Sequence, residues 1–271
     1  MSKLVILSFS ILFSFQSFGQ GFLDGFMKGK EHTDISLSYS YENYNTYWGA
    51  EDISITRDIQ SVSIYAAHGI TDWADIVLAA PYVNNTGLAG LQDGTAMLRF
   101  KFLEFQTTEV KLSLLGGVGY SLPLSDYETE SAFAIGQQAE AIPARLIFSA
   151  MHNNGWFVQL QSGYTWRTDP TPPSFPVIAK LGFASASQYF DVWFHKQQAE
   201  GGFDYRDGFN QPFRSFGVSF SKVGATYYRP LKPWIGGFFQ AAYTLDGRNV
   251  GQAIRASIGF TLKFENFKLA K

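Results

Sequence analysis

Apolar and polar side chains alternate along most of this chain. In residues 61–83, SVSIYAAHGITDWADIVLAAPYV, Val62 and Ile64 alternate with serines, and Ile76 and Leu78 resume the alternation after a short turn. A period of two is that of a β-strand, and a tight turn between two such strands makes them antiparallel. This segment is therefore predicted to be a β-hairpin with one apolar face.

The same pattern recurs to the end of the chain and predicts about 12 strands of roughly 9 to 15 residues. The connections alternate in length, and the short ones fall near Gly69, Gln106, Asn153, Ala186 and Leu231. An even number of long antiparallel strands with alternately short and long connections is typical of bacterial outer-membrane barrels. The fold class predicted is an all-β, transmembrane, antiparallel up-and-down β-barrel with both chain ends on the periplasmic side.

Two features favour a membrane barrel over a soluble sandwich. Charged residues make up only 16% of the chain, and the face opposite the apolar one carries mostly Ser, Gly, Gln and Thr, which suit a wet lumen. Aromatic residues also fall near the predicted strand ends, namely Tyr82, Trp156, Trp166, Trp234 and Phe264. Together they resemble interfacial girdles, although plain packing would explain any one of them.

Closure of such a barrel requires its first and last strands to pair, because no backbone group can remain unpaired in hydrocarbon. We expect residues 35–44 to pair antiparallel with residues 251–264. Glu42 and Arg255 would then meet across the seam as an ion pair, or each would be solvated separately in the lumen. The outward apolar positions change phase within residues 213–229, from Phe216, Val218 and Phe220 to Val223, Ala225 and Tyr227, which predicts a bulge near Ser221 and Lys222. Pro143 predicts another bulge, or a position above the bilayer.

The N-terminus predicts export from the cytoplasm. Lys3 precedes an apolar run, and small residues follow near Gly19, which is the pattern of a secretory signal peptide over residues 1–19. We divide the rest into an N-terminal tail or plug (20–33), the barrel (34–265) and a C-terminal tail (266–271). The expected location is the outer membrane of a Gram-negative bacterium, with membrane lipid and the outer-membrane assembly machinery as partners.

Composition excludes several other classes. The formal net charge of -2 argues against nucleic acid as a partner, and the absence of cysteine removes disulfides and thiolate metal sites. No cofactor or metal motif is present. His195 follows Asp191 on one strand face, which invites a hydrolase reading, but residues four apart on a strand are roughly 13 Å apart. No enzymatic activity is expected.

Charged and aromatic side chains on the predicted inner face are the candidates for contact with a solute. They are Glu42, Arg99, Lys101, Lys111, Arg145, Arg167, Asp191, Trp193, His195 and Arg255. Arg99, Lys101 and Lys111 lie on two neighbouring strands joined by a short turn, so we expect them to cluster toward the periplasmic half. Cations outnumber acids in the set, which suggests either a preference for anionic solutes or an internal ladder of ion pairs with Asp75 offsetting Lys101. Tyr65, Met97 and Phe157 would join Trp193 in apolar contacts.

Four segments resemble the MetA-like phenol-degradation family of outer-membrane transporters. They are HGITDWADIVLAAPYV (68–83), GLQDGTAMLRFKFL (90–103), GGVGYSLPLSD (116–126) and LDGRNVG (245–251). The chain departs from the family pattern at Gln92 and Leu124. The resemblance implies a barrel that passes small hydrophobic or aromatic molecules, in the manner of FadL-like channels, and it supplies no catalytic or binding residues.

The functional expectation is a passive or gated channel with a narrow lumen, since about 12 strands lie between small filled barrels and wide porins. Residues 20–32, 125–137 or 199–211 could occlude it. The alternatives are a non-conducting structural or partner-binding barrel and an outer-membrane lipid hydrolase.

Overall fold

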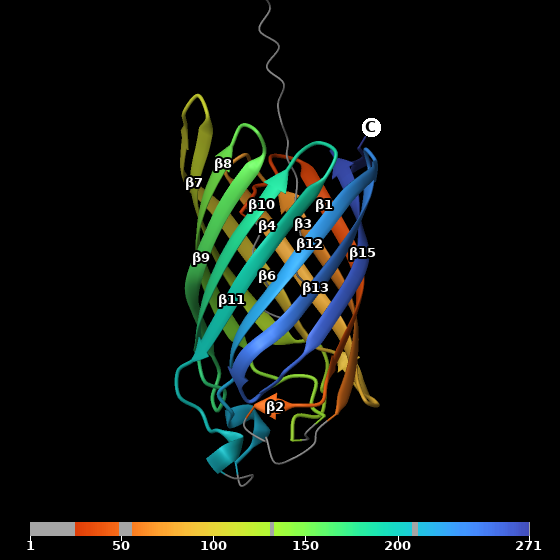
Figure 1. Cartoon of the computed structure of the whole chain (residues 1–271), viewed down its shortest axis with the longest axis vertical. Coiled ribbons are helices and arrows are strands. Elements are labelled where there is room, and N and C mark those ends of the chain that lie inside the picture. Colours follow the sequence, from red (N-terminus) through yellow and green to blue (C-terminus); the bar gives the residue numbers. More distant parts are fainter. Residues whose placement is uncertain (1–24, 49–55, 131–132, 208–210, 271) are drawn as a thin grey trace, which may run out of the picture.

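The computed structural model describes residues 25–48, 56–130, 133–207 and 211–270, and the predicted signal peptide lies outside this part of the chain. The described chain forms one closed antiparallel barrel of twelve long strands (Figure 1). These strands are β1 (His32–Tyr44), β3 (Arg57–Gly69), β4 (Ala74–Asn85), β6 (Asp93–Gln106), β7 (Val110–Pro123), β8 (Ala141–His152), β9 (Trp156–Arg167), β10 (Ser174–Ala184), β11 (Tyr189–Ala199), β12 (Ser219–Lys232), β13 (Ile235–Arg248) and β15 (Ile254–Glu265). No helix in the described ranges is long and apolar enough to cross a membrane.

Short strands and 3-10 helices lie at the two ends of the barrel. Five lie among the long connections: β2 (Tyr47–Trp48) and β14 (Val250–Gly251), which pair with each other, β5 (Leu88–Leu91), and the short 3-10 helices η1 (Tyr205–Asp207) and η2 (Phe213–Ser215). At the opposite end, β16 (Lys268–Leu269) pairs with β15 within the segment expected to be a C-terminal tail. The end with the short turns also holds the C-terminus (Figure 1).

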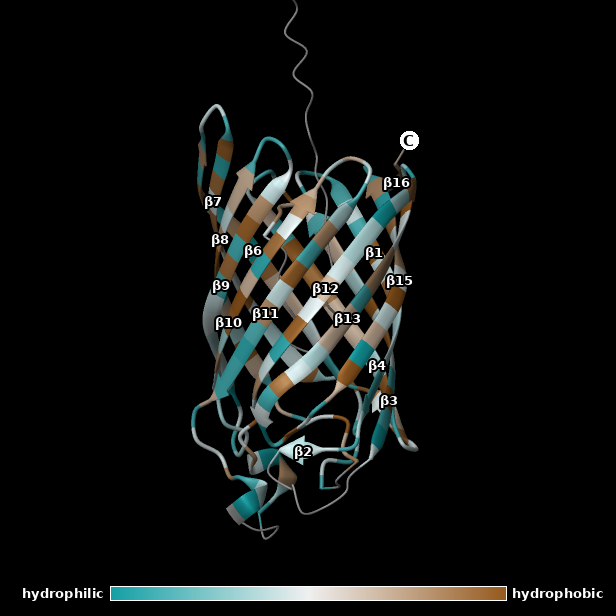
Figure 2. Ribbon diagram, in the orientation of Figure 1, coloured by the Kyte–Doolittle hydropathy of each residue, from teal (hydrophilic) through white to brown (hydrophobic). Residues whose placement is uncertain are grey.

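The alternation of the sequence becomes an alternation between lipid-facing and lumen-facing side chains. Ile64 at the centre of β3 is 49% exposed, whereas its neighbours Ser63 and Tyr65 are 3% and 4% exposed. Brown hydrophobic bands recur along the strands in Figure 2. A closed barrel with an apolar exterior leaves no unpaired backbone edge in hydrocarbon, so this is the architecture of an outer-membrane barrel.

The seam of the barrel closes as the sequence predicted. β1 pairs with β15 without a break from His32 opposite Glu265 to Asn43 opposite Ile254. Glu42 and Arg255 are direct partners in this register, and their side chains form an ion pair with Nη1 3.3 Å from Oε2. The expected pair is therefore formed, and the alternative of separate solvation is not what the structure shows.

Several irregularities interrupt the ladders. The β12–β13 register shifts beside Ser221 and Lys222, as expected, but the extra residue is Leu245 on β13. Alternation along β12 therefore continues unbroken, so Phe220 and Lys222 both line the lumen, whereas the sequence had suggested an outward apolar face for Phe220. Pairing of β8 with β7 skips Pro143, which has no N–H to donate. Further shifts lie between Lys101 and Leu103 on β6 and between Pro230 and Lys232 on β12.

Candidate functional site

The N-terminal segment enters the barrel and is held by two buried ion pairs. Lys28 Nζ lies 3.0 Å from Asp34 Oδ2, and Arg99 donates two 2.6 Å hydrogen bonds to Asp75, whose side chain is fully buried. Both members of the second pair also hold the backbone, because Arg99 Nη2 donates to the Phe26 carbonyl and the Lys28 amide donates to Asp75. The expected partner of Asp75 was Lys101, so that prediction was wrong. Asp75 and Arg99 are opposite each other in the β4–β6 register, which places their side chains together.

Phe26 packs among apolar side chains that fill part of the lumen. Its ring meets Phe157 edge-on at 5.2 Å, and Phe157 stacks on Tyr189 at 5.5 Å. Tyr65 and Met97 belong to the same buried cluster. These three predicted apolar contacts, Tyr65, Met97 and Phe157, therefore pack in an apolar layer together with the N-terminal segment.

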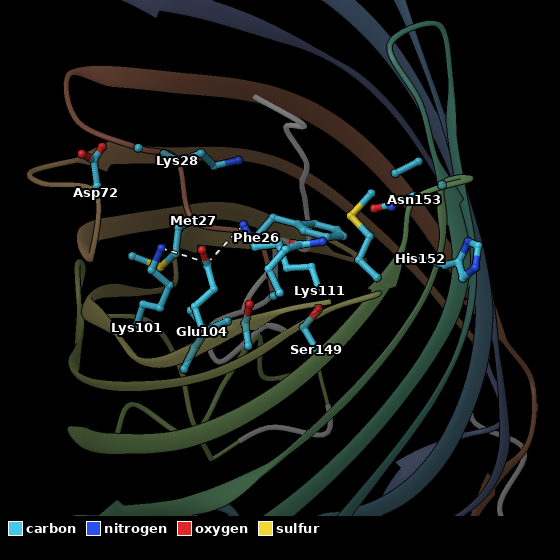
Figure 3. A pocket seen from close by; sticks show the side chains of 18 of the residues that line it. Phe26, Met27, Lys28, Asp72, Lys101, Glu104, Lys111, Ser149, His152 and Asn153 are labelled. Carbon is cyan, nitrogen blue, oxygen red and sulfur yellow. Dashed lines mark hydrogen bonds and ion pairs between the residues drawn. The ribbon is translucent and has the colours of Figure 1, made fainter. Parts of the chain in front are cut away.

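A cavity of about 650 Å³ lies on the short-turn side of the barrel, and we call it the turn-side cavity (Figure 3). Its lining includes Phe26, Met27 and Lys28 of the N-terminal segment, together with residues of the turns that follow β8 and β10. Lys101 and Lys111 both face it and share one carboxylate, with their Nζ atoms 2.9 Å and 3.1 Å from Glu104 Oε2. The predicted cluster of cations at this end is thus formed by Lys101 and Lys111, while Arg99 is engaged with Asp75.

A second cavity of about 310 Å³ lies below the long loops, and we call it the loop-side cavity. Five predicted residues line it, namely Glu42, Arg167, Trp193, His195 and Arg255. The two cavities share no lining residue among those described. The barrel therefore holds two separate spaces along its lumen.

Arg255 is fixed by three partners in the wall of the loop-side cavity. Besides its ion pair with Glu42, its Nη2 donates to the hydroxyls of Ser40 at 2.8 Å and Ser61 at 3.2 Å. These serines come from neighbouring strands, so the guanidinium spans β15, β1 and β3. Such a guanidinium is a rigid part of the wall.

Arg145, Arg167 and Asp191 also point into the lumen, and each forms hydrogen bonds with other groups of the barrel wall. Arg145 donates to the carbonyls of Ala144 and Tyr164 and to the Thr165 hydroxyl. Arg167 donates to the Pro172 carbonyl and to Ser174. Asp191 accepts from Tyr189 at 2.5 Å and lies 3.8 Å from Lys180 Nζ. These contacts stabilise the barrel wall.

His195 contacts an aromatic ring, and Asp191 has other partners. Its ring meets the Phe220 ring edge-on at 4.9 Å, while Asp191 is engaged with Tyr189 and Lys180. A catalytic dyad would need a carboxylate that orients the imidazole. Within the described ranges no group of His, Asp and Glu side chains is placed to hold a metal ion.

Loop residues roof the loop-side cavity. Gln137 lines it and donates to the carbonyls of Arg214 and Phe216, while Arg214 donates back to the carbonyls of Gln137 and Gln138. Tyr127 donates a 2.5 Å hydrogen bond to Asp93, and burial raises the pKa of the Tyr127 hydroxyl, so it stays a donor at neutral pH. The described parts of the loops at 124–140 and 200–218 are therefore joined directly over the cavity.

Several lining residues of the loop-side cavity were not singled out as site candidates from the sequence. Phe220, Lys222 and Tyr243 lie beside the register shift between β12 and β13. The sequence signal was the phase change itself, but it cannot tell which strand carries the extra residue. Only the partner strand decides that.

The fold matches solved outer-membrane proteins. The COG4313 outer membrane channel from Pseudomonas putida F1 superposes with a TM-score of 0.71 over 87% of this chain and 96% of that one, at 13% identity. The NanC porin superposes with a TM-score of 0.55 over 85% of this chain and 100% of that one, at 7% identity. No protein-family model and no curated protein matches the sequence. The chain thus has the fold of outer-membrane channels and porins.

Proposed function

We propose that this chain is an outer-membrane channel that passes small, hydrophobic or aromatic solutes by passive or gated diffusion. The observation that carries the proposal is the pair of cavities in one lumen, separated by an apolar layer that includes Phe26. A structural barrel has no need of space at both ends of its lumen. The resemblance of four segments to the MetA-like transporter family supports the same solute class.

The lining of the loop-side cavity suits an aromatic solute with a polar group. Trp193, Phe220 and Tyr243 offer aromatic surfaces, while Gln197 and Gln240 offer amide groups. Binding pockets for small molecules commonly combine a mostly apolar lining with a few convergent polar groups. A solute of this kind would exchange its hydration shell for ring contacts and amides.

The N-terminal segment forms the gate in this proposal. Phe26 contacts the wall through its carbonyl, which accepts a hydrogen bond from Arg99, and through its ring, so small shifts of residues 25–28 would widen the passage. The buried ion pairs at Lys28 and Arg99 would keep the segment inside the barrel while it moves.

Liposome swelling tests the channel. Liposomes that contain the purified protein should swell faster in benzyl alcohol and benzoate than in a sugar of similar size. Replacing Phe26 with Ala should increase every rate, because the ring that narrows the lumen is removed. The matched control is Phe105→Ala on the outer face, where the side chain is 63% exposed. This substitution should leave the rates unchanged.

Other outcomes identify the alternatives. If neither the native protein nor Phe26→Ala admits any solute, the barrel is a structural or partner-binding protein. Release of fatty acid from the liposomes, lost on replacing His195 with Ala, would identify a lipid hydrolase.

A further inference from the structure

The cations of the lumen differ in whether an acid already neutralises them. Lys28, Arg99, Lys101, Lys111, Lys180 and Arg255 each have a carboxylate oxygen within 4.0 Å. Lys222 lines the loop-side cavity, yet its ammonium has neither an ion pair nor a hydrogen bond with any described residue. An ammonium without an anion beside it is costly away from bulk water.

The surroundings of Lys222 are aromatic. Its Nζ lies 4.6 Å from the centre of the Phe220 ring, and His195, its direct cross-strand partner, meets the same ring from the edge. Trp193 lies two residues before His195 on the same face of β11 and lines the same cavity. An ammonium and several ring faces therefore converge on one space.

The charges that line the cavity do not balance. Arg167, Lys222 and Arg255 are cationic, whereas Glu42 and Asp93 are the carboxylates. With His195 neutral, one positive charge remains. A single monoanion would neutralise the cavity, and a dianion would overcompensate it.

We propose that Lys222 anchors the carboxylate of an aromatic monocarboxylate in the loop-side cavity, with the ring of the solute against Phe220 and Trp193. This inference rests on the proposed function and names the solute class of the same lumen. The cavity volume of about 310 Å³ suits a molecule with one ring. The lumen cations predicted from the sequence are not available to bind this carboxylate, because each already forms an ion pair with an acid or hydrogen bonds with the barrel wall.

Calorimetric titration of the full-length protein in detergent tests the site with three probes of similar shape. Benzoate should bind more tightly than benzyl alcohol, and benzylammonium should bind most weakly. Lys222→Met keeps the apolar stem and removes the charge. It should lower the affinity for benzoate by about tenfold, the usual scale for a charge-assisted contact. Its affinity for benzyl alcohol should not change.

Two variants control for charge and fold. Lys222→Arg should retain benzoate affinity, and Lys196→Met, which removes a cation from the exposed outer face of the neighbouring strand, should bind like the native protein. The proposal is overturned if the native protein does not bind benzoate, or if Lys222→Met leaves its affinity unchanged. Equal losses for benzoate and benzyl alcohol would overturn it too. Benzoate binding that depends on Lys222 in a barrel without solute flux would support the site and reject the proposed function.

Discussion

Asp75 and Arg99 show how much depends on single buried side chains in the lumen. Both are essentially inaccessible to solvent, and their two 2.6 Å hydrogen bonds form a bidentate pair. Removing one partner from a buried ion pair leaves an uncompensated charge, and this costs more than the pair itself contributes. Exposed pairs behave differently because water solvates each partner.

We therefore expect Asp75→Asn to lower the free energy of unfolding by about 3 kcal/mol. Urea titration of the protein in lipid vesicles, followed by tryptophan fluorescence, measures this change. Lys101→Met, which breaks a partly exposed pair with Glu104, should change the same quantity by less than about 1 kcal/mol. The double variant Asp75→Asn with Arg99→Met should recover part of the loss. If Asp75→Asn lowered the free energy of unfolding as little as Lys101→Met does, the stabilising role of the buried Asp75–Arg99 pair would be contradicted.

At the scale of elements, the described residues between β11 and β12 are held by contacts with the turn after β13. Asn249 accepts a hydrogen bond from the Tyr205 amide and donates to the carbonyls of Phe203 and Gly217. Asp204 holds the same region, since Arg206 Nη2 lies 2.6 Å and Arg248 Nε 3.3 Å from its Oδ2. These contacts keep η1 and η2 folded over the loop-side cavity.

The hydrogen bonds from Arg206 lower the pKa of Asp204 below its ordinary value. A carboxylate with a lowered folded-state pKa stabilises the fold above its unfolded pKa of about 3.9, and this contribution is lost as the pH falls through the folded value. Hydrogen-exchange protection of the described residues 200–207, corrected for intrinsic rates, should therefore fall below about pH 4. Asp204→Asn should show the lower protection throughout. Protection in that variant equal to the native protein at neutral pH would refute the role of Asp204.

At the scale of the whole molecule, the exposed apolar belt fixes where the barrel lies in the membrane. Ile64 is half-exposed at the centre of β3, while Leu231 is 67% exposed where β12 reaches the short-turn rim. A charge on the lipid face is costly at the bilayer midplane and inexpensive near the interface. The two positions therefore report on depth.

Ile64→Arg should destabilise the protein in lipid vesicles by about 2 to 4 kcal/mol, and Leu231→Arg by about 1 kcal/mol or less. Equilibrium unfolding of both variants in the same vesicles gives the comparison. Similar losses at the two positions would mean that the belt does not lie across the bilayer as the strand positions indicate.

The alternation of side chains was sufficient to predict the barrel, its closure and the inward residues, except Phe220 beside the β12–β13 register shift. Alternation is local, because each peptide unit reverses the side-chain direction whatever its neighbours are. The pairing of residues 35–44 with 251–264, and with it the contact of Glu42 and Arg255, follows from the need to leave no strand edge in lipid. These features could be predicted from the chain alone.

Contacts across the lumen could not be predicted from the alternation of side chains. They depend on the stagger between strands and on segments, such as residues 25–28, that do not alternate. Asp75 pairs with Arg99 and not with the predicted partner Lys101, because the β4–β6 register places Asp75 opposite Arg99. The position of Phe26 in the lumen and of Lys222 without an acid follows from which segments and strands meet there. Except beside the β12–β13 register shift, the sequence by itself determined which side chains face inward. Only the tertiary structure decided which of them neutralise one another, since that requires distances between residues far apart in the chain.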